Sequence, residues 1–172
     1  RHIVTHHAGH IPTTAAELLK LPGVGRYTAA AVASIAFKQP VAVLDGNVAR
    51  VLARWFDIDQ SIDDAPVKAE LWSLAESLVP KRPPANPSDY NQAVMELGAL
   101  VCTPRQPQCL TCPVASLCRA YALGRVDDLP VRRTRRKPVA VTHHVIALRR
   151  GRKLLFEQRP PNGLWSNMWQ LP

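Results

Sequence analysis

The chain has 172 residues with a formal net charge of +9, a pI of about 10.0 and 47% hydrophobic residues. This length corresponds to about one domain, and the hydrophobic fraction is sufficient for a packed core. No apolar run approaches the ~18 residues of a membrane-spanning helix, and the N-terminus lacks the apolar core of a signal peptide. We therefore expect a cytoplasmic protein whose basic surface binds a polyanion, chiefly nucleic acid, with a merely soluble basic protein as the alternative.

Residues 14–124 are predicted to be mainly helical. Thr14 and Glu17 have the spacing of a capping box, which predicts a helix start. The Pro- and Gly-rich residues 21–25 end that helix, and Pro40 closes the next one. Apolar side chains at helical spacing predict the later helices. The predicted helices cover residues 14–20, 26–37, 45–56, 66–78 and 88–101, with a last short helix over 113–124.

The character of the sequence changes after Gly124. Residues 131–137 are an arginine-rich run that predicts an exposed basic linker. Residues 139–148 and 153–158 read as β-strands joined by a turn at Arg150-Gly151. The predicted organisation is a helical domain over residues 1–124, an interdomain linker over 125–138, and the beginning of a second, β-containing domain over 139–172.

All four cysteines fall within residues 102–118, with the spacing C-x6-C-x2-C-x5-C. Disulfides are the least expected state, because a chain of a reducing compartment with an ample core does not need them. Zinc sites with four thiolates usually pair two C-x2-C knuckles, and here there is one. A [4Fe–4S] cluster also takes four thiolates, so the residues alone leave zinc and iron–sulfur about evenly matched. The candidate metal ligands are Cys102, Cys109, Cys112 and Cys118.

The turn Leu21-Pro22-Gly23-Val24-Gly25 joins two predicted helices. Its glycines permit a close backbone approach, and N–H groups at the start of the following helix form a small anion site. Such a site holds a DNA phosphate without reading sequence, although a helix C-cap and a tight turn look similar. Asp45 precedes the next helix, where the dipole stabilises a negative charge, and an ordinary N-cap is its alternative role.

These motifs together resemble the endonuclease III and MutY DNA glycosylases over about residues 11–124. The cysteine spacing resembles their cluster loop, which implies a [4Fe–4S] cofactor. The turn followed by Val43-Leu44-Asp45-Gly46 resembles their helix–hairpin–helix and catalytic aspartate. The implied fold is mainly α, a helix–hairpin–helix glycosylase domain with an iron–sulfur loop. The implied DNA contacts are Leu21, Pro22, Gly23, Val24, Gly25, Arg26 and Tyr27, with Arg105 of the cysteine loop as a further phosphate contact or a solvated charge.

Two residues define the chemistry that this resemblance implies. Asp45 would stabilise the oxocarbenium character of the deoxyribose as the N-glycosidic bond breaks. Members that also cut the strand carry a Schiff-base lysine two residues after the second hairpin glycine. Tyr27 stands there in this chain, which implies a monofunctional glycosylase with water as the final nucleophile.

The tail from Phe156 to Pro172 resembles the opening of a Nudix-type, MutT-like α+β domain, which MutY proteins carry and endonuclease III lacks. The resemblance therefore implies removal of adenine mispaired with 8-oxoguanine or guanine in double-stranded DNA, by a monomer associated with the bacterial nucleoid. Because residue 1 is Arg and the chain stops at Pro172, we expect further sequence on both sides. The family's general-acid glutamate would then lie outside these residues, which predicts an inactive fragment. The alternatives are an endonuclease III-like lyase and a non-catalytic, metal-bound DNA-binding module.

Overall fold

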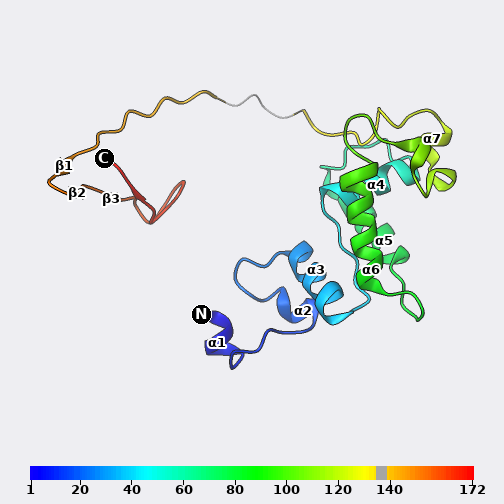
Figure 1. Ribbon diagram of the computed structural model, residues 1–172, viewed down its shortest axis with the longest axis horizontal. Helices are drawn as coiled ribbons and strands as arrows, with labels where there is room; N and C mark the ends of the chain where they lie inside the picture. The colour runs from blue at the N-terminus through cyan, green and yellow to red at the C-terminus, as the bar shows by residue number, and fades with distance from the viewer. Residues whose placement is uncertain (135–138) are drawn as a thin grey trace. The chain divides into compact units, whose positions relative to one another are not determined.

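The computed structural model describes residues 1–134 and 139–172, and the chain divides into two compact units, Arg1–Thr134 and Arg135–Pro172 (Figure 1). Part of the predicted basic linker, residues 135–138, lies outside the described residues. Within the described part of the chain, no helix is long and apolar enough to cross a membrane.

Unit 1 is helical, as predicted. Its α-helices are α1 (His2–His6), α2 (Ala15–Leu18), α3 (Arg26–Phe37), α4 (Gly46–Phe56), α5 (Ala65–Leu78), α6 (Pro87–Glu96) and α7 (Arg119–Ala122). The π-helical turn η1 (Leu97–Val101) and the 3-10 turns η2 (Cys109–Thr111) and η3 (Ala115–Leu117) complete it. Four of the six predicted helices are confirmed to within a few residues, and α1 was not predicted.

Two helix predictions need correction. The helix expected over residues 88–101 changes to π-helical hydrogen bonding at Leu97. Arg50 of α4 donates to the carbonyl oxygens of Gly98 and Cys102 at this turn, 2.7 and 2.8 Å away. The helix expected over 113–124 is only η3 followed by the four-residue α7. Cys118 separates these two turns in extended backbone, so a continuous helix cannot form there.

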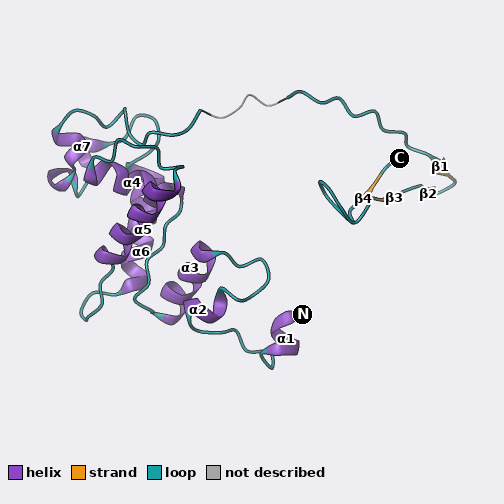
Figure 2. Ribbon diagram, turned by 180° about the vertical axis from the view of Figure 1, so that it is seen from behind, coloured by secondary structure: helices purple, strands orange, loops and turns teal. Residues whose placement is uncertain are grey.

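Helix α4 is the centre of the larger apolar core. Its Val51, Leu52 and Ala53 are at most 1% exposed, and they pack with Leu71 of α5 and Val94 of α6. A second cluster joins α2 to α3 through Leu18, Leu21, Ala29 and Ala33. Figure 2 shows α2 beside α3, and α4, α5 and α6 packed as a group. The segment that leads into Asp45 is held by this core, since residues 42–44 are buried.

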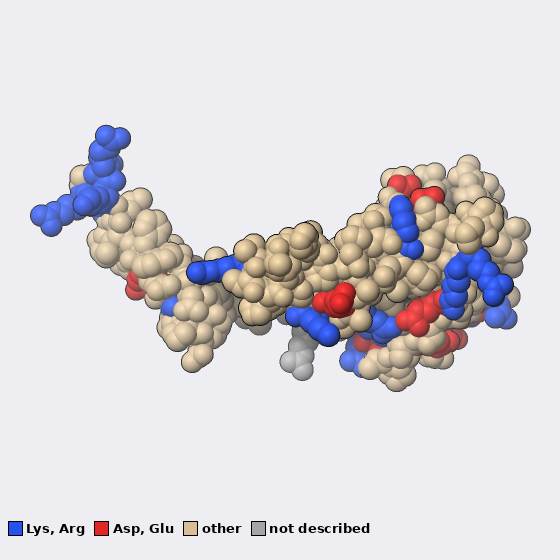
Figure 3. Space-filling model, turned by 90° about the horizontal axis from the view of Figure 1, so that it is seen from below, with Lys and Arg blue, Asp and Glu red and all other residues tan. Residues whose placement is uncertain are grey.

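Residues 125–134, which we assigned to the linker, lie within unit 1. Leu129 is 2% exposed, and the Val131 carbonyl oxygen accepts from the Ile62 N–H at 3.0 Å. Arg125 pairs with Asp57 at 2.8 Å, and Arg133 pairs with Asp64 at 2.6 Å. Basic and acidic side chains are accordingly interspersed on the face of unit 1 in Figure 3. The basic side chains therefore do not form a uniform basic surface on that face.

Unit 2 contains two short antiparallel pairs. β1 (Arg149–Arg150) pairs with β2 (Lys153–Leu154), and β3 (Glu157–Gln158) pairs with β4 (Trp169–Gln170). The turn at Arg150-Gly151 is confirmed, with Gly151 at a φ of 61°. The strand predicted over residues 139–148 is wrong: those residues form no strand, and pairing begins only at Arg149. Alternating apolar residues favour a strand, but the backbone hydrogen bonds of this segment are isolated and do not extend into a ladder. They join Ile146 N to the Pro172 carbonyl oxygen at 2.8 Å and Leu155 N to the Leu148 carbonyl oxygen at 3.0 Å.

Candidate functional site

The turn between α2 and α3 has the geometry expected of an open backbone loop. Gly23 adopts a φ of 78°, which favours glycine, and Val24 N donates to the Leu21 carbonyl oxygen at 3.1 Å. Leu21 is buried at 8% exposure and anchors the turn to the core. A Cβ placed on Gly23 or Gly25 would meet no atom within 4 Å. The backbone of this turn is therefore accessible to a ligand.

Helix α3 begins directly after the turn, with Gly25 as its extended N-cap. The first hydrogen bond of the helix runs from Ala29 N to the Gly25 carbonyl oxygen at 2.9 Å. The N–H groups of residues 26–28 precede that bond and have no partner within the helix. They give the turn three further donors for an anion.

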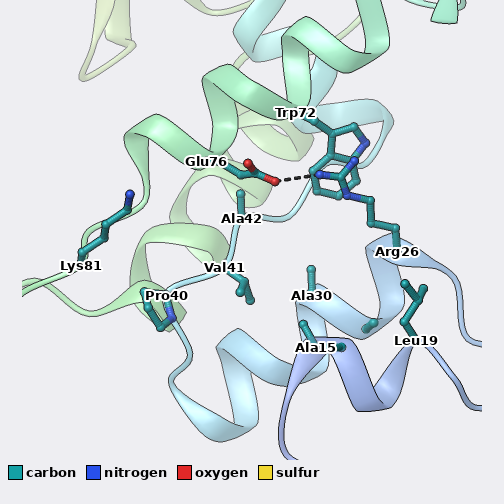
Figure 4. Close-up of a pocket in the computed structure, with 12 residues that line it drawn as sticks. Ala15, Leu19, Arg26, Ala30, Pro40, Val41, Ala42, Trp72, Glu76 and Lys81 are labelled. Carbon is teal, nitrogen blue, oxygen red and sulfur yellow. Dashed lines mark hydrogen bonds and ion pairs between the residues drawn. The ribbon is translucent and has the colours of Figure 1, made fainter.

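The side chain of Arg26 extends away from the turn toward α5. Its Nη2 donates to Glu76 Oε1 at 2.7 Å, and its guanidinium lies 3.8 Å from the centroid of the Trp72 ring. Figure 4 shows this pair at one wall of an open pocket between α2, α3 and α5, which Leu19 and Val41 also line. The ion pair is more than half exposed, so it contributes little to stability.

Tyr27 occupies the first turn of α3 and is 40% exposed. Its hydroxyl donates to the Met95 Sδ of α6 at 3.7 Å. The ring therefore lies between the start of α3 and α6, and it offers no amine for a Schiff base.

Asp45 is the N-cap of α4. Its Oδ1 accepts hydrogen bonds from the backbone N–H groups of Asn47 and Val48, at 2.9 and 2.7 Å. Its Oδ2 accepts a longer bond from Asn47 Nδ2 at 3.4 Å. The side chain is only partly buried, so this capped carboxylate remains open to solvent or to a ligand.

Asn91 is a supporting residue that the sequence did not reveal. It is 1% exposed on α6, its Oδ1 accepts from Val43 N at 3.3 Å, and its Nδ2 donates to the Val41 carbonyl oxygen at 2.9 Å. The Asn91 side-chain amide thereby fixes the segment that immediately precedes Asp45. A single asparagine in a helix carries no sequence signal for this role.

A continuous set of hydrogen bonds joins Asp45 to the cysteine loop. Asn47 Oδ1 accepts from Arg50 Nη2 at 2.9 Å, and Arg50 Nε donates to the Cys102 carbonyl oxygen at 2.8 Å. Burial lowers the pKa of the Arg50 guanidinium from its ordinary value. Gly98 lets η1 lie close to the start of α4, because a Cβ at Gly98 would lie 2.8 Å from Asn47 Cβ.

The four cysteines line one pocket beside α4, together with Arg54 and Trp55. All four are partly buried and free of disulfides. Burial raises the pKa of the Cys109 and Cys118 thiols. Among residues 1–134 and 139–172, no three His, Cys, Asp or Glu side chains are gathered around a point that fits a single metal ion.

Arg105 lies in the loop between Cys102 and Cys109 and is exposed. Its carbonyl oxygen accepts from Thr103 Oγ1 at 2.9 Å, which shapes the loop and leaves the guanidinium at the surface.

Family models match the two motifs of unit 1. The helix-hairpin-helix motif matches residues 6–35, and the iron-sulfur binding domain of endonuclease III matches residues 102–118. The adenine DNA glycosylase of Homo sapiens is 40% identical over 220 residues, covering 100% of this chain and 39% of that protein. Those of Mus musculus and Buchnera aphidicola of Schizaphis graminum are 53% and 30% identical, covering 77% and 94% of this chain and 26% and 46% of those proteins. The chain belongs to the MutY-type helix–hairpin–helix glycosylases.

Solved structures of the same superfamily share the fold. A thermostable thymine-DNA glycosylase has a TM-score of 0.62 and 35% identity, covering 72% of this chain and 55% of that one. A non-covalent endonuclease III–DNA complex has a TM-score of 0.57 and 32% identity, covering 72% and 54%. This MutY-type chain spans less than half the length of the curated relatives named above.

Membership of the MutY family decides between the two metals that the cysteine spacing left open. The cofactor is a [4Fe–4S] cluster. The residues fit this group, because four thiols and a buried arginine surround one pocket and thiolates are the ligands that such clusters take.

Proposed function

We propose that the protein is an adenine DNA glycosylase that hydrolyses the N-glycosidic bond of adenine opposite 8-oxoguanine or guanine in duplex DNA. The names of the relatives support the base and the reaction class. The observation that carries the proposal is the Asp45 carboxylate, which is capped by two backbone N–H groups and remains partly open. Such a fixed negative charge stabilises a cationic sugar without reorganising during the reaction.

In this proposal the turn between α2 and α3 grips the DNA backbone. A phosphate binds the N–H groups around Gly23 and Gly25. Arg26 contributes its backbone N–H, while its guanidinium pairs with Glu76. The turn residues Leu21, Pro22 and Val24 shape this grip. Arg105 provides a second phosphate contact from the cysteine loop.

With the backbone held, the adenine flips out of the duplex toward Asp45. The carboxylate stabilises the oxocarbenium character that develops as the N-glycosidic bond breaks. Water then completes hydrolysis, because Tyr27 stands where a lyase needs an amine.

We assign the cluster ligands to Cys102, Cys109, Cys112 and Cys118. The match of the iron–sulfur domain to residues 102–118 and the shared pocket support this assignment. The bound cluster supplies a structural crosslink between the end of η1 and the start of α7. Through Arg50 it also fixes the end of α4 that carries Asp45.

We also propose that residues 139–172 begin a Nudix-like domain that reads the base opposite adenine. Residues 125–138 would connect it to the glycosylase domain, with residues 125–134 packed within unit 1. The resemblance of residues 156–172 to the opening of a Nudix-type domain supports this, and the alignment with the human relative includes these residues. A monomer associated with the bacterial nucleoid stays a prediction.

Base release by the intact protein tests the proposal. Duplexes with adenine opposite 8-oxoguanine or guanine should lose adenine, an adenine–thymine duplex should not, and strand scission should need added alkali. The competing function is a lyase. It is supported by the similarity, at 32% identity, to a trapped endonuclease III–DNA covalent intermediate. A covalent DNA adduct after borohydride reduction would favour the lyase. Binding without any base release would favour a non-catalytic module.

A polypeptide of residues 1–172 alone is expected to excise adenine about 10²–10⁴-fold more slowly than the intact protein, the usual contribution of a general acid. This expectation assumes that the family's general acid, a glutamate, is not among these residues. Excision by this polypeptide at the rate of the intact protein would contradict the expectation.

A further inference from the structure

Arg54 is a buried arginine in the last turn of α4. It lies on α4 and is 1% exposed, which makes it one of the largest fully buried side chains of the protein. Its Nε donates to the carbonyl oxygens of Val126 and Leu129, 3.0 and 2.9 Å away. Its Nη1 donates to the Thr103 carbonyl oxygen at 2.8 Å and to Cys102 Sγ at 3.3 Å.

The positive charge of this guanidinium has no protein counter-ion in the described part of the chain. None of the ion pairs formed by residues 1–134 and 139–172 includes Arg54. Its Nη2 is buried and has no hydrogen-bond partner among the same residues. A buried charge that lacks both a counter-ion and a full set of acceptors is strongly destabilising. The structure therefore calls for an anionic group next to Arg54.

The position of Arg54 identifies that group. Its side chain lines the same pocket as Cys102, Cys109, Cys112 and Cys118. A [4Fe–4S] core held by four thiolates carries a net negative charge, and hydrogen bonds and charges near the sulfurs tune its reduction potential. Arg50, the other buried arginine of α4, donates instead to carbonyl oxygens and to Asn47.

We propose that Arg54 is the buried counter-charge of the [4Fe–4S] cluster, a positioning residue that retains the cluster and raises its reduction potential. The inference rests on the proposed ligand set. It extends that set with a residue that binds no metal itself. The carbonyl contacts of Arg54 at Thr103, Val126 and Leu129 would serve structure even without a cluster, so the test must separate charge from shape.

Three variants of the intact protein make this separation. Arg54→Met removes the charge at similar length, and Arg54→Lys keeps the charge. Arg119→Met removes an exposed charge at the start of α7, next to Cys118. The readouts are iron per chain, the rate at which a chelator bleaches the visible absorption, and the electrochemical potential of the cluster. Helical content by circular dichroism reports folding separately.

Arg54→Met loses hydrogen bonds from a charged group, so we expect its cluster to bleach about 10- to 100-fold faster than that of the wild type. Its reduction potential should be more negative. Arg54→Lys should retain its cluster far longer than Arg54→Met, and Arg119→Met should match the wild type. Wild-type bleaching and potential in Arg54→Met would overturn the inference. So would equal cluster loss in Arg54→Met and Arg54→Lys with an unshifted potential. If Arg54→Met does not fold, Arg54→Lys decides the question. Retention of the cluster in Arg54→Lys supports the role of the charge, and loss of the cluster overturns it. A wild-type protein without iron would instead overturn the ligand set itself.

Discussion

Replacing Gly98 by alanine tests the contact between η1 and the start of α4. A glycine-to-alanine change in a helical turn normally stabilises a protein by about 0.4–1 kcal/mol, because it restricts the unfolded chain. Here the new Cβ would lie 2.8 Å from Asn47 Cβ and 3.1 Å from the Asn47 backbone carbonyl carbon and oxygen. All three are backbone atoms or the Cβ of Asn47, so the clash cannot be relieved by moving the end of a flexible side chain.

The two effects have opposite signs, and their magnitudes decide the outcome. Overpacking a well-filled site costs about 1–3 kcal/mol, which exceeds the helix gain. We therefore expect Gly98→Ala to be destabilised by about 1–2 kcal/mol. It should also excise adenine more slowly, since Asn47 donates hydrogen bonds to the Asp45 carboxylate.

The assay is denaturant unfolding of the intact protein, followed by helical circular dichroism, together with single-turnover excision. Ala99→Ser is the matched control, because it adds one atom at an exposed position of the same turn. Such surface changes stay within about 0.5 kcal/mol. A Gly98→Ala protein that is as stable as the wild type, or more stable, would refute the steric argument.

Four further variants probe the core, the Asp45 support, the exposed ion pair and a partly buried phenol. Leu71→Ala, at a site that is 0% exposed, should cost about 2–5 kcal/mol in denaturant unfolding, whereas a cost below 1 would show that the core collapses around it. Asn91→Ala should cost about 1–3 kcal/mol and slow excision, because Val43 N and the Val41 carbonyl oxygen lose their partner; unchanged excision would contradict its support of Asp45. Glu76→Gln should change stability by less than about 1 kcal/mol, and a larger loss would show that its pair with Arg26 is more than a surface contact. Burial raises the pKa of Tyr90, so its contribution to stability is present below the ordinary tyrosine pKa of about 10 and is lost as pH rises further. Tyr90→Phe should flatten that alkaline loss, and an identical pH profile would contradict the shift.

Local signals in the sequence predicted the helices well. Thr14 caps α2 through Glu17, Asp45 caps α4, and prolines begin or follow several other helices. The open turn at Gly23 also follows from residues that are adjacent in the sequence. Each of these features depends on groups within a few residues, so the sequence carries the information directly.

Features that depend on distant residues were missed. The π-helical turn at Leu97 is bonded to Arg50, which lies on another helix. The strand expected over residues 139–148 has a suitable apolar pattern, but its backbone bonds at Ile146 and Leu148 are isolated and form no ladder. Arg54 shares its helix with apolar residues, and only the packed structure reveals that its guanidinium is buried beside the cysteines.

The role of Asp45 is the claim on which the proposed reaction depends, and Asp45→Asn in the intact protein tests it most directly. Asparagine caps a helix as well as aspartate does, so the fold and DNA binding should persist while the negative charge is lost. The measurement is single-turnover release of adenine from a duplex with adenine opposite 8-oxoguanine, at protein concentrations that saturate binding. We predict a loss of at least about 10²-fold, the scale of removing one preorganised electrostatic contact. Excision at the wild-type rate by a protein that binds DNA normally would contradict the account.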